Sequence, residues 1–148
     1  PTPTRTKTPL DETANWKTYT NAQYGFELKY PADMDTKALS TSPNLVVSIE
    51  PRQYKYSWFE IRTRNIPNQS LDNYYYLDFS QSGKTTMGNQ QAVIFKAPNG
   101  YCDGPSCGSP FIAYVTKKGD IFYHLVFYGD DALNSIELNI LKSFIFTR

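Results

Sequence analysis

WKTYTNAQYGFELKYPADM, residues 16–34, is the stretch that decides the fold. Its apolar residues alternate with glycine or charged residues, which is the period-2 pattern of a strand with one buried face: Tyr24, Phe26, Leu28 and Tyr30. Gly25 permits a turn with positive φ before the strand, and Pro31 ends it because proline cannot donate to a ladder. The stretch therefore predicts a turn, a strand and a stop.

Length and composition indicate one sheet-rich domain. The 148 residues are 40% hydrophobic, which suits a single core, and 16% aromatic with 12 tyrosines, a residue that favours strands. Fifteen basic residues against fourteen acidic ones give a net charge of +1, so we expect no nucleic-acid partner. No apolar run approaches the roughly 18 residues of a membrane span, so we expect no transmembrane segment in this chain.

The N-terminal residues 1–14 alternate threonine and proline without an apolar period, and we interpret them as a flexible stalk before one domain at 15–148. Two interpretations stay open. In the first, the stalk remains after removal of a signal segment, with a lipid anchor upstream, and the monomeric domain lies outside the cytoplasm. In the second, the segment is an ordinary disordered chain end.

Further along, alternating or continuous apolar runs predict strands at 45–49, 56–65, 85–87, 91–97, 111–116, 121–128 and 144–146. The last long strand, 121–128, is apolar on both faces and should be central in the sheet. Ser70 predicts the start of a helix over Leu71–Gln81, with Leu71, Tyr75 and Phe79 on one stripe. Asp130 and Asp131 predict the start of a second helix, with an apolar stripe formed by Leu133, Ile136, Ile140 and Leu141.

Three short motifs carry a family resemblance: Tyr24-Gly25-Phe26 followed by Leu28 and Tyr30-Pro31, Gly88–Ala92 followed by Val93-Ile94-Phe95, and Ile140–Phe144. Over residues 16–147 the chain resembles the PsbP-like family, although Met34 stands where many members carry tryptophan. The resemblance implies an α+β fold, a twisted antiparallel sheet flanked by helices on both faces (an α/β/α sandwich). It implies no single activity.

Catalytic and metal-binding motifs are weak throughout the sequence. Gly83-Lys84-Thr85 lacks the earlier glycine of a phosphate loop, because that position is Asp78. His124 is the one histidine and is interpreted as a packed, hydrogen-bonded residue under a helix. Two cysteines and one histidine are too few for structural zinc. We therefore predict no enzyme activity, no cofactor and no metal.

The long loop YCDGPSCGSP, residues 101–110, is the first candidate contact site. Gly104 and Pro105 allow the reversal that a disulfide between Cys102 and Cys107 requires, and free thiols are the alternative. The predicted partner-binding residues of this loop are Tyr101, Asp103, Pro105 and Ser106.

A sheet face with Trp58, Arg62 and Arg64 on alternate positions is the second candidate, since an aromatic ring beside two guanidinium groups resembles an interface hot spot. A solvated sheet face is the simpler interpretation. Together these features predict a non-enzymatic extracytoplasmic binding or assembly module whose partner is an unknown protein or cell-envelope component. The alternative is a carbohydrate-binding module with an exposed aromatic platform.

Overall fold

A computed structural model of the chain describes residues 13–37, 44–52, 58–76, 79–97, 110–129 and 133–148, together with the backbone of 101–103 and 106–108. The predicted stalk and the residues Asp130 and Asp131 therefore lie almost wholly outside the described part. The described helix is too short to cross a membrane.

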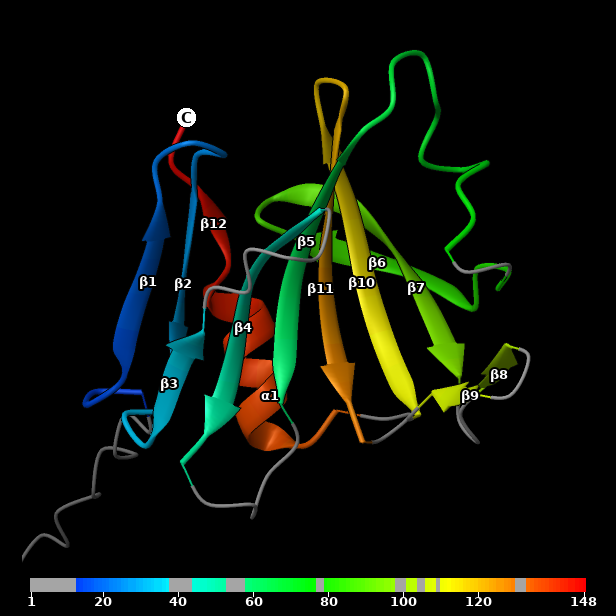
Figure 1. Ribbon diagram of the computed structural model, residues 1–148. Helices are drawn as coiled ribbons and strands as arrows, with labels where there is room; N and C mark the ends of the chain where they lie inside the picture. The colour runs from blue at the N-terminus through cyan, green and yellow to red at the C-terminus, as the bar shows by residue number, and fades with distance from the viewer. Residues whose placement is uncertain are drawn as a thin grey trace, which may run out of the picture.

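Strands dominate the described chain and form three antiparallel sheets (Figure 1). The central sheet has seven strands in the order β3-β4-β5-β11-β10-β7-β6, a smaller sheet has the order β1-β2-β12, and β8 pairs with β9. The bounds are β1 Lys17–Asn21, β2 Phe26–Tyr30, β3 Met34–Lys37, β4 Leu45–Pro51, β5 Phe59–Asn65, β6 Gly83–Met87, β7 Gln90–Ala97, β8 Tyr101–Asp103, β9 Ser106–Gly108, β10 Phe111–Lys118, β11 Ile121–Tyr128 and β12 Ile145–Phe146, with the helix α1 Ser135–Ser143.

Residues 24–31 behave as their pattern predicts, whereas the strand β1 in the same stretch was not predicted. Gly25 has φ 67°, and the alternate residues Phe26, Leu28 and Tyr30 of β2 are buried. The ring of Phe26 stacks on Phe144 with centroids 5.3 Å apart. This packing joins β2 to the residue that follows α1, so the stretch holds the small sheet and the helix together.

One face of the central sheet, here called face A, is covered by the small sheet and α1 (Figure 1). Tyr123 of β11 donates a hydrogen bond of 2.8 Å from its hydroxyl to the Tyr24 carbonyl, which ties the two sheets together. The central strand β11 is buried on both faces as predicted, and its face A residues include Leu125 and Phe127.

The opposite face, face B, is covered over β11, β10 and β7 by described residues of 66–76 and by Phe79, and the predicted helix Leu71–Gln81 is wrong. The described residues there form turns and an isolated bridge between Tyr76 and Phe79. Tyr74 and Tyr76 are buried whereas Tyr75 is 66% exposed, which is the alternation of an extended chain. An extended segment buries two tyrosines on face B, whereas the expected helical stripe would have buried Tyr75.

The predicted α/β/α sandwich is therefore wrong as well. The described chain is mostly β, and its one helix, α1, has nine residues and lies on face A. Face B is covered by backbone that is not helical. The run of three tyrosines explains the difference, because aromatic side chains favour extended structure over a short helix.

The helix α1 also starts later than Asp130 and Asp131 predict. Its N-cap is Asn134, whose side chain accepts a hydrogen bond of 2.8 Å from the Glu137 backbone amide. The Glu137 carboxylate accepts one of 3.2 Å from the Asn134 amide, which completes a capping box. The acidic residue that meets the helix dipole is therefore Glu137.

Candidate partner-binding surface

The two candidate contact regions lie at the same end of the central sheet, here called the hairpin end and defined by Trp58, Pro110, Tyr128, Gly129 and the β8–β9 hairpin (Figure 1). The Trp58 carbonyl accepts a hydrogen bond of 3.1 Å from the Tyr128 amide, and the Gly129 amide donates one of 2.8 Å to the Pro110 carbonyl. These bonds join the start of β5 to the base of the cysteine loop.

An aromatic and ionic cluster extends from the hairpin end onto face B. The Trp58 ring stacks on the Tyr128 ring, with centroids 4.9 Å apart and planes 16° apart. The Tyr128 hydroxyl donates to Oε2 of Glu60 at 3.1 Å, and Nε of Arg62 donates to the same oxygen at 2.8 Å. Because Glu60 is buried and Trp58 and Arg62 are half-buried, this face is a packed cluster and not a solvated surface.

The cluster has fixed charges near neutral pH. Burial, then the nearby Tyr76 and Glu60, raises the pKa of the Tyr128 hydroxyl far above its ordinary value, so this group stays a donor. Burial lowers the pKa of Arg62, but the charge and the hydrogen bond of Glu60 raise it overall. The Tyr128 hydroxyl therefore stays protonated and the Arg62 guanidinium stays charged near neutral pH.

Arg64 lies apart from this cluster. It pairs with Phe122 near the other end of β5, about 20 Å along the strand from Trp58 at roughly 3.3 Å per residue. Burial raises the pKa of Tyr74, and the charge and a hydrogen bond of Arg64 oppose this rise, which places Arg64 beside the cover of face B. The structure thus brings Trp58 and Arg62 together through Glu60 and Tyr128, and it separates Arg64 from them.

His124 is buried beneath the same cover, and the prediction of a packed, hydrogen-bonded histidine is confirmed. Its Nε2 lies 2.7 Å from the Tyr74 hydroxyl, and its Nδ1 lies 3.3 Å from the Arg62 carbonyl. The expected covering helix is absent among the described residues, and the rings of Tyr74 and Tyr76 take its place. Burial lowers the pKa of His124 to about 3, so the ring is neutral.

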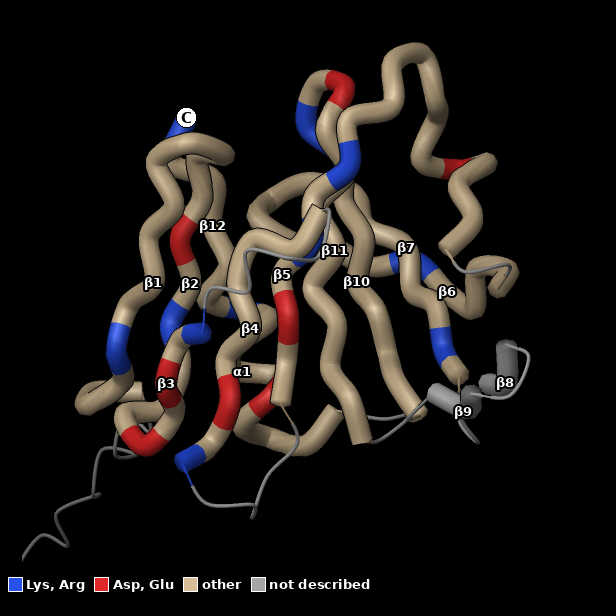
Figure 2. Tube along the Cα trace, viewed as in Figure 1, with Lys and Arg blue, Asp and Glu red and all other residues tan. Residues whose placement is uncertain are grey.

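Exposed ion pairs lie on and beside the edge strand β3 (Figure 2). Asp35 accepts from Arg52 at 2.8 Å and from Lys17 at 3.2 Å, and Lys37 pairs with Glu50. The hydrogen bonds from Arg52 and then Lys17 lower the pKa of Asp35 to about 2. Figure 2 shows few charges on β10 and β11 away from their turn, whereas β3, β4 and β5 carry charges of both signs and β6 and β7 carry basic positions.

In the cysteine loop, the described backbone forms the β8–β9 ladder, which sets Cys102 directly opposite Cys107. Cα atoms of directly opposed antiparallel residues lie about 4.5–5.5 Å apart, within the range that a disulfide spans. The side chains of Tyr101, Asp103 and Ser106, and all of Pro105, lie outside the described part, so their predicted role stays a prediction.

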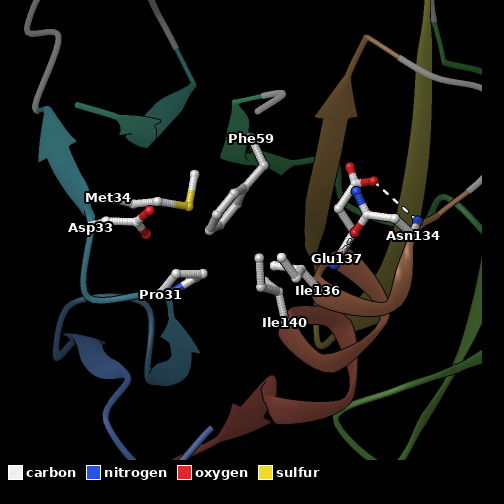
Figure 3. A pocket seen from close by; sticks show the side chains of 8 residues that line it. All are labelled: Pro31, Asp33, Met34, Phe59, Asn134, Ile136, Glu137 and Ile140. Carbon is white, nitrogen blue, oxygen red and sulfur yellow. Dashed lines mark hydrogen bonds between the residues drawn. The ribbon is translucent and has the colours of Figure 1, made fainter. Parts of the chain in front are cut away.

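Sequence reasoning missed a cavity of about 70 Å³ between β3, β5 and α1, at the same end of the molecule (Figure 3). Met34, Phe59, Ile136 and Ile140 point into one space from three different elements. Asp33 lies beside Met34 and points the same way. No local pattern in the sequence indicates this cavity, because its lining comes from three segments that are far apart in the chain.

Chemistry beyond binding finds little support in the described residues. No three of their His, Cys, Asp and Glu side chains come close enough together to hold a metal ion. Gly83, Lys84 and Thr85 belong to the edge strand β6 and do not form a phosphate-binding turn. The arrangement provides aromatic surface, fixed ion pairs and one apolar cavity.

Comparison with known proteins agrees with this architecture. No family model matches the sequence, and no curated protein matches it. Among solved structures, the chain is similar to cyanobacterial PsbP (CyanoP) from Synechocystis sp. PCC 6803, with a TM-score of 0.66 and 13% identity over 88% of this chain and 92% of that one. The chain therefore has the PsbP-like fold.

A protein from Bacteroides thetaiotaomicron VPI-5482 is also similar, with a TM-score of 0.61 and 12% identity. The match covers 89% of this chain and 48% of that one, so the present domain spans about half of the larger protein. At identities this low, the similarity shows a shared fold alone.

Proposed function

We propose that this chain is a non-enzymatic binding or assembly module that contacts a protein or cell-envelope partner through the hairpin end. The observation that carries the proposal is the convergence of two regions far apart in sequence, since Trp58 and Pro110 are linked through Tyr128 and Gly129. The proposed contact residues are Trp58 and Arg62 on the sheet, together with Tyr101, Asp103, Pro105 and Ser106 in the loop.

The physical basis is pre-organisation. The Trp58 ring is fixed by its stack on Tyr128, and the Arg62 guanidinium is fixed by Glu60, so little side-chain entropy would be lost when a partner covers them. Tryptophan and arginine are also the residue types that most often dominate interface energies. Arg64 is left out of the surface because it lies near the other end of β5.

The proposal includes a disulfide between Cys102 and Cys107 and an extracytoplasmic location, because such bonds persist in oxidising compartments. The β8–β9 register supports the pairing. Intact-mass measurement of unreduced protein should give a mass about 2 Da below that of the reduced chain. Two thiols that react with an alkylating reagent before reduction would contradict both the bond and the location.

The carbohydrate-platform alternative receives no support from the described aromatic residues. A stacking platform needs several exposed, coplanar rings, whereas Tyr75 is the one large aromatic side chain that is exposed in the described part. Most of the other described tyrosines pack in the two cores or against them.

The test uses the full chain immobilised as bait in an envelope extract from its source cells, with Trp58→Ala and a variant in which residues 102–107 are replaced by a Gly/Ser linker. Tyr75→Ala is the matched control, because it removes an exposed ring from the cover of face B. A partner retained by the parent and by Tyr75→Ala should bind Trp58→Ala about 30-fold more weakly, as for a hot spot of about 2 kcal/mol. Folded Trp58 and loop variants that bind like the parent would refute this placement.

A further inference from the structure

We propose that the cavity between β3, β5 and α1 receives one branched aliphatic side chain of a partner polypeptide, and that Asp33 pairs with a lysine, arginine or α-ammonium group beside it. This inference deepens the proposed function, because it gives the chemistry of a partner segment that would bind next to the hairpin end. It concerns a surface that does not include Trp58 or the cysteine loop.

The walls of the cavity select an aliphatic group. The accessible apolar lining comes mainly from the half-buried side chains of Pro31 and Ile136, and beneath them Phe59, Ile140 and Met34, which are 1–3% exposed, form an apolar floor. The volume of about 70 Å³ is roughly half of the 150 Å³ at which an engineered cavity accommodates benzene. An isopropyl-sized group therefore suits the space better than an aromatic ring.

The two carboxylates that line the cavity differ in availability. Glu137 is buried and engaged in the capping box with Asn134. Asp33 is exposed, and among the described residues its carboxylate forms no ion pair, since the neighbouring Arg52 pairs with Asp35. The Asp33 side chain points toward the cavity beside Met34 in Figure 3. The Asp33 charge also acts on Arg52, which lies nearby, but no cation of the described residues contacts the Asp33 carboxylate directly, so a cation at the mouth could do so.

These two features determine the orientation of the ligand. The aliphatic group enters the apolar interior, where a charge would be costly, and the cationic group stays at the exposed mouth near Asp33. A lysine side chain that entered the cavity would carry its ammonium group into hydrocarbon. The partner segment that fits therefore has an aliphatic side chain in the cavity and a separate cationic group next to it in the chain. The two binding terms are burial of apolar surface and one exposed ion pair.

The experiment uses the two methionines of the chain, because Met34 lines the cavity and Met87 lies in β6 at the opposite edge of the sheet. With methyl-¹³C methionine, the full chain gives one reporter and one internal control. The probes are 3-methylbutylammonium and 3-methylbutan-1-ol, which share a carbon skeleton and differ in charge. We expect the ammonium to shift the Met34 signal and leave Met87 in place, and to bind about threefold more tightly than the alcohol.

Two variants complete the test. Asp33→Asn should bring the ammonium affinity down to that of the alcohol, and Ile136→Phe should fill the cavity and remove both responses. Asp33 is exposed, so the first variant keeps the inference testable even if the second fails to fold. Equal affinities of the two probes in the parent, a silent Met34 signal, or equal shifts of Met34 and Met87 would overturn the inference. None of these results bears on Trp58→Ala, so the two proposals fail separately.

Discussion

Gly88 lies in the two-residue turn between β6 and β7, where the chain passes close to the C-terminal strand β12. Its φ is 60°, and a Cβ at this position would lie 2.9 Å from Cδ2 of Phe146 and 3.1 Å from Cδ1 of Phe144. Both rings pack on Tyr123 and on each other. Gly88→Ala therefore introduces backbone strain and a steric conflict together.

Each effect has an approximate size. An alanine with left-handed φ costs about 1–2 kcal/mol, and an extra methyl in a packed core costs about 1–3 kcal/mol. Gly119, in the β10–β11 turn, separates the two terms, because its φ is 62° and a Cβ added there would have no other atom within 4 Å. Gly119→Ala should therefore lower the free energy of unfolding by about 1–2 kcal/mol, and Gly88→Ala by about 2–5 kcal/mol.

The assay is urea unfolding of the parent and both variants, followed by tryptophan fluorescence, with m-values compared to confirm that the same surface unfolds. Any entropy that alanine removes from the unfolded chain is common to the two variants and cancels in their difference. In a Phe146→Leu background the extra cost of Gly88→Ala should shrink, since the two nearest conflicting atoms, both of the Phe146 ring, are gone and only Phe144 remains. Equal losses for Gly88→Ala and Gly119→Ala would refute the packing of β12 against this turn.

Two further predictions concern buried and bridging side chains. His124 has its pKa lowered from 6.5 to about 3 by burial, so the unfolded chain takes up a proton first as the pH falls. Its contribution to the free energy of unfolding is complete above pH 6.5 and is lost as the pH falls toward 3. In urea titrations, His124→Gln should reduce the slope of the free energy of unfolding against pH between pH 6.5 and 5 by up to about 1.4 kcal/mol per pH unit. An unchanged slope would contradict the neutral buried ring. Ser143 accepts from the Lys29 amide at 2.9 Å and donates to the Ile140 carbonyl at 2.7 Å. Ser143→Ala should cost about 1 kcal/mol and speed hydrogen exchange of the Lys29 amide, with Ser82→Ala as control; unaltered exchange there would argue against the bridge.

Local patterns predict the longer strands of the central sheet well, but they did not predict β1, β3 or the short β8–β9 ladder. The strand 121–128 has the predicted bounds and is buried on both faces, and the turn at Gly88 and Asn89 has positive φ at both residues, as a tight hairpin requires. Such features depend on neighbours in sequence, so the period of two and the turn residues determine them.

The covering layers were harder to predict because they depend on contacts between distant residues. Leu71, Tyr75 and Phe79 have helical spacing, but face B offers two buried ring sites, which Tyr74 and Tyr76 fill in an extended chain. Of the candidate site, alternation placed Trp58 and Arg62 on one face correctly. The spacing did not indicate that Tyr128, 70 residues further along the chain, stacks on the Trp58 ring. It also did not indicate that Arg64 lies near the other end of β5.

The connections between strands at the hairpin end leave room for a binding surface on the sheet. At the opposite end, β6–β7 and β10–β11 close with the two-residue turns Gly88-Asn89 and Gly119-Asp120, although the longer connections 38–44 and 66–82 also leave β3 and β5 there. At the hairpin end lie the connections 52–58, 98–110 and 129–134. Residues there can change without shifting the register of the seven-stranded sheet, so a partner-specific surface can be built on a fixed scaffold. The Trp58–Tyr128 stack and the cavity beside Asp33 both lie at that end, and a single extended partner segment could contact both.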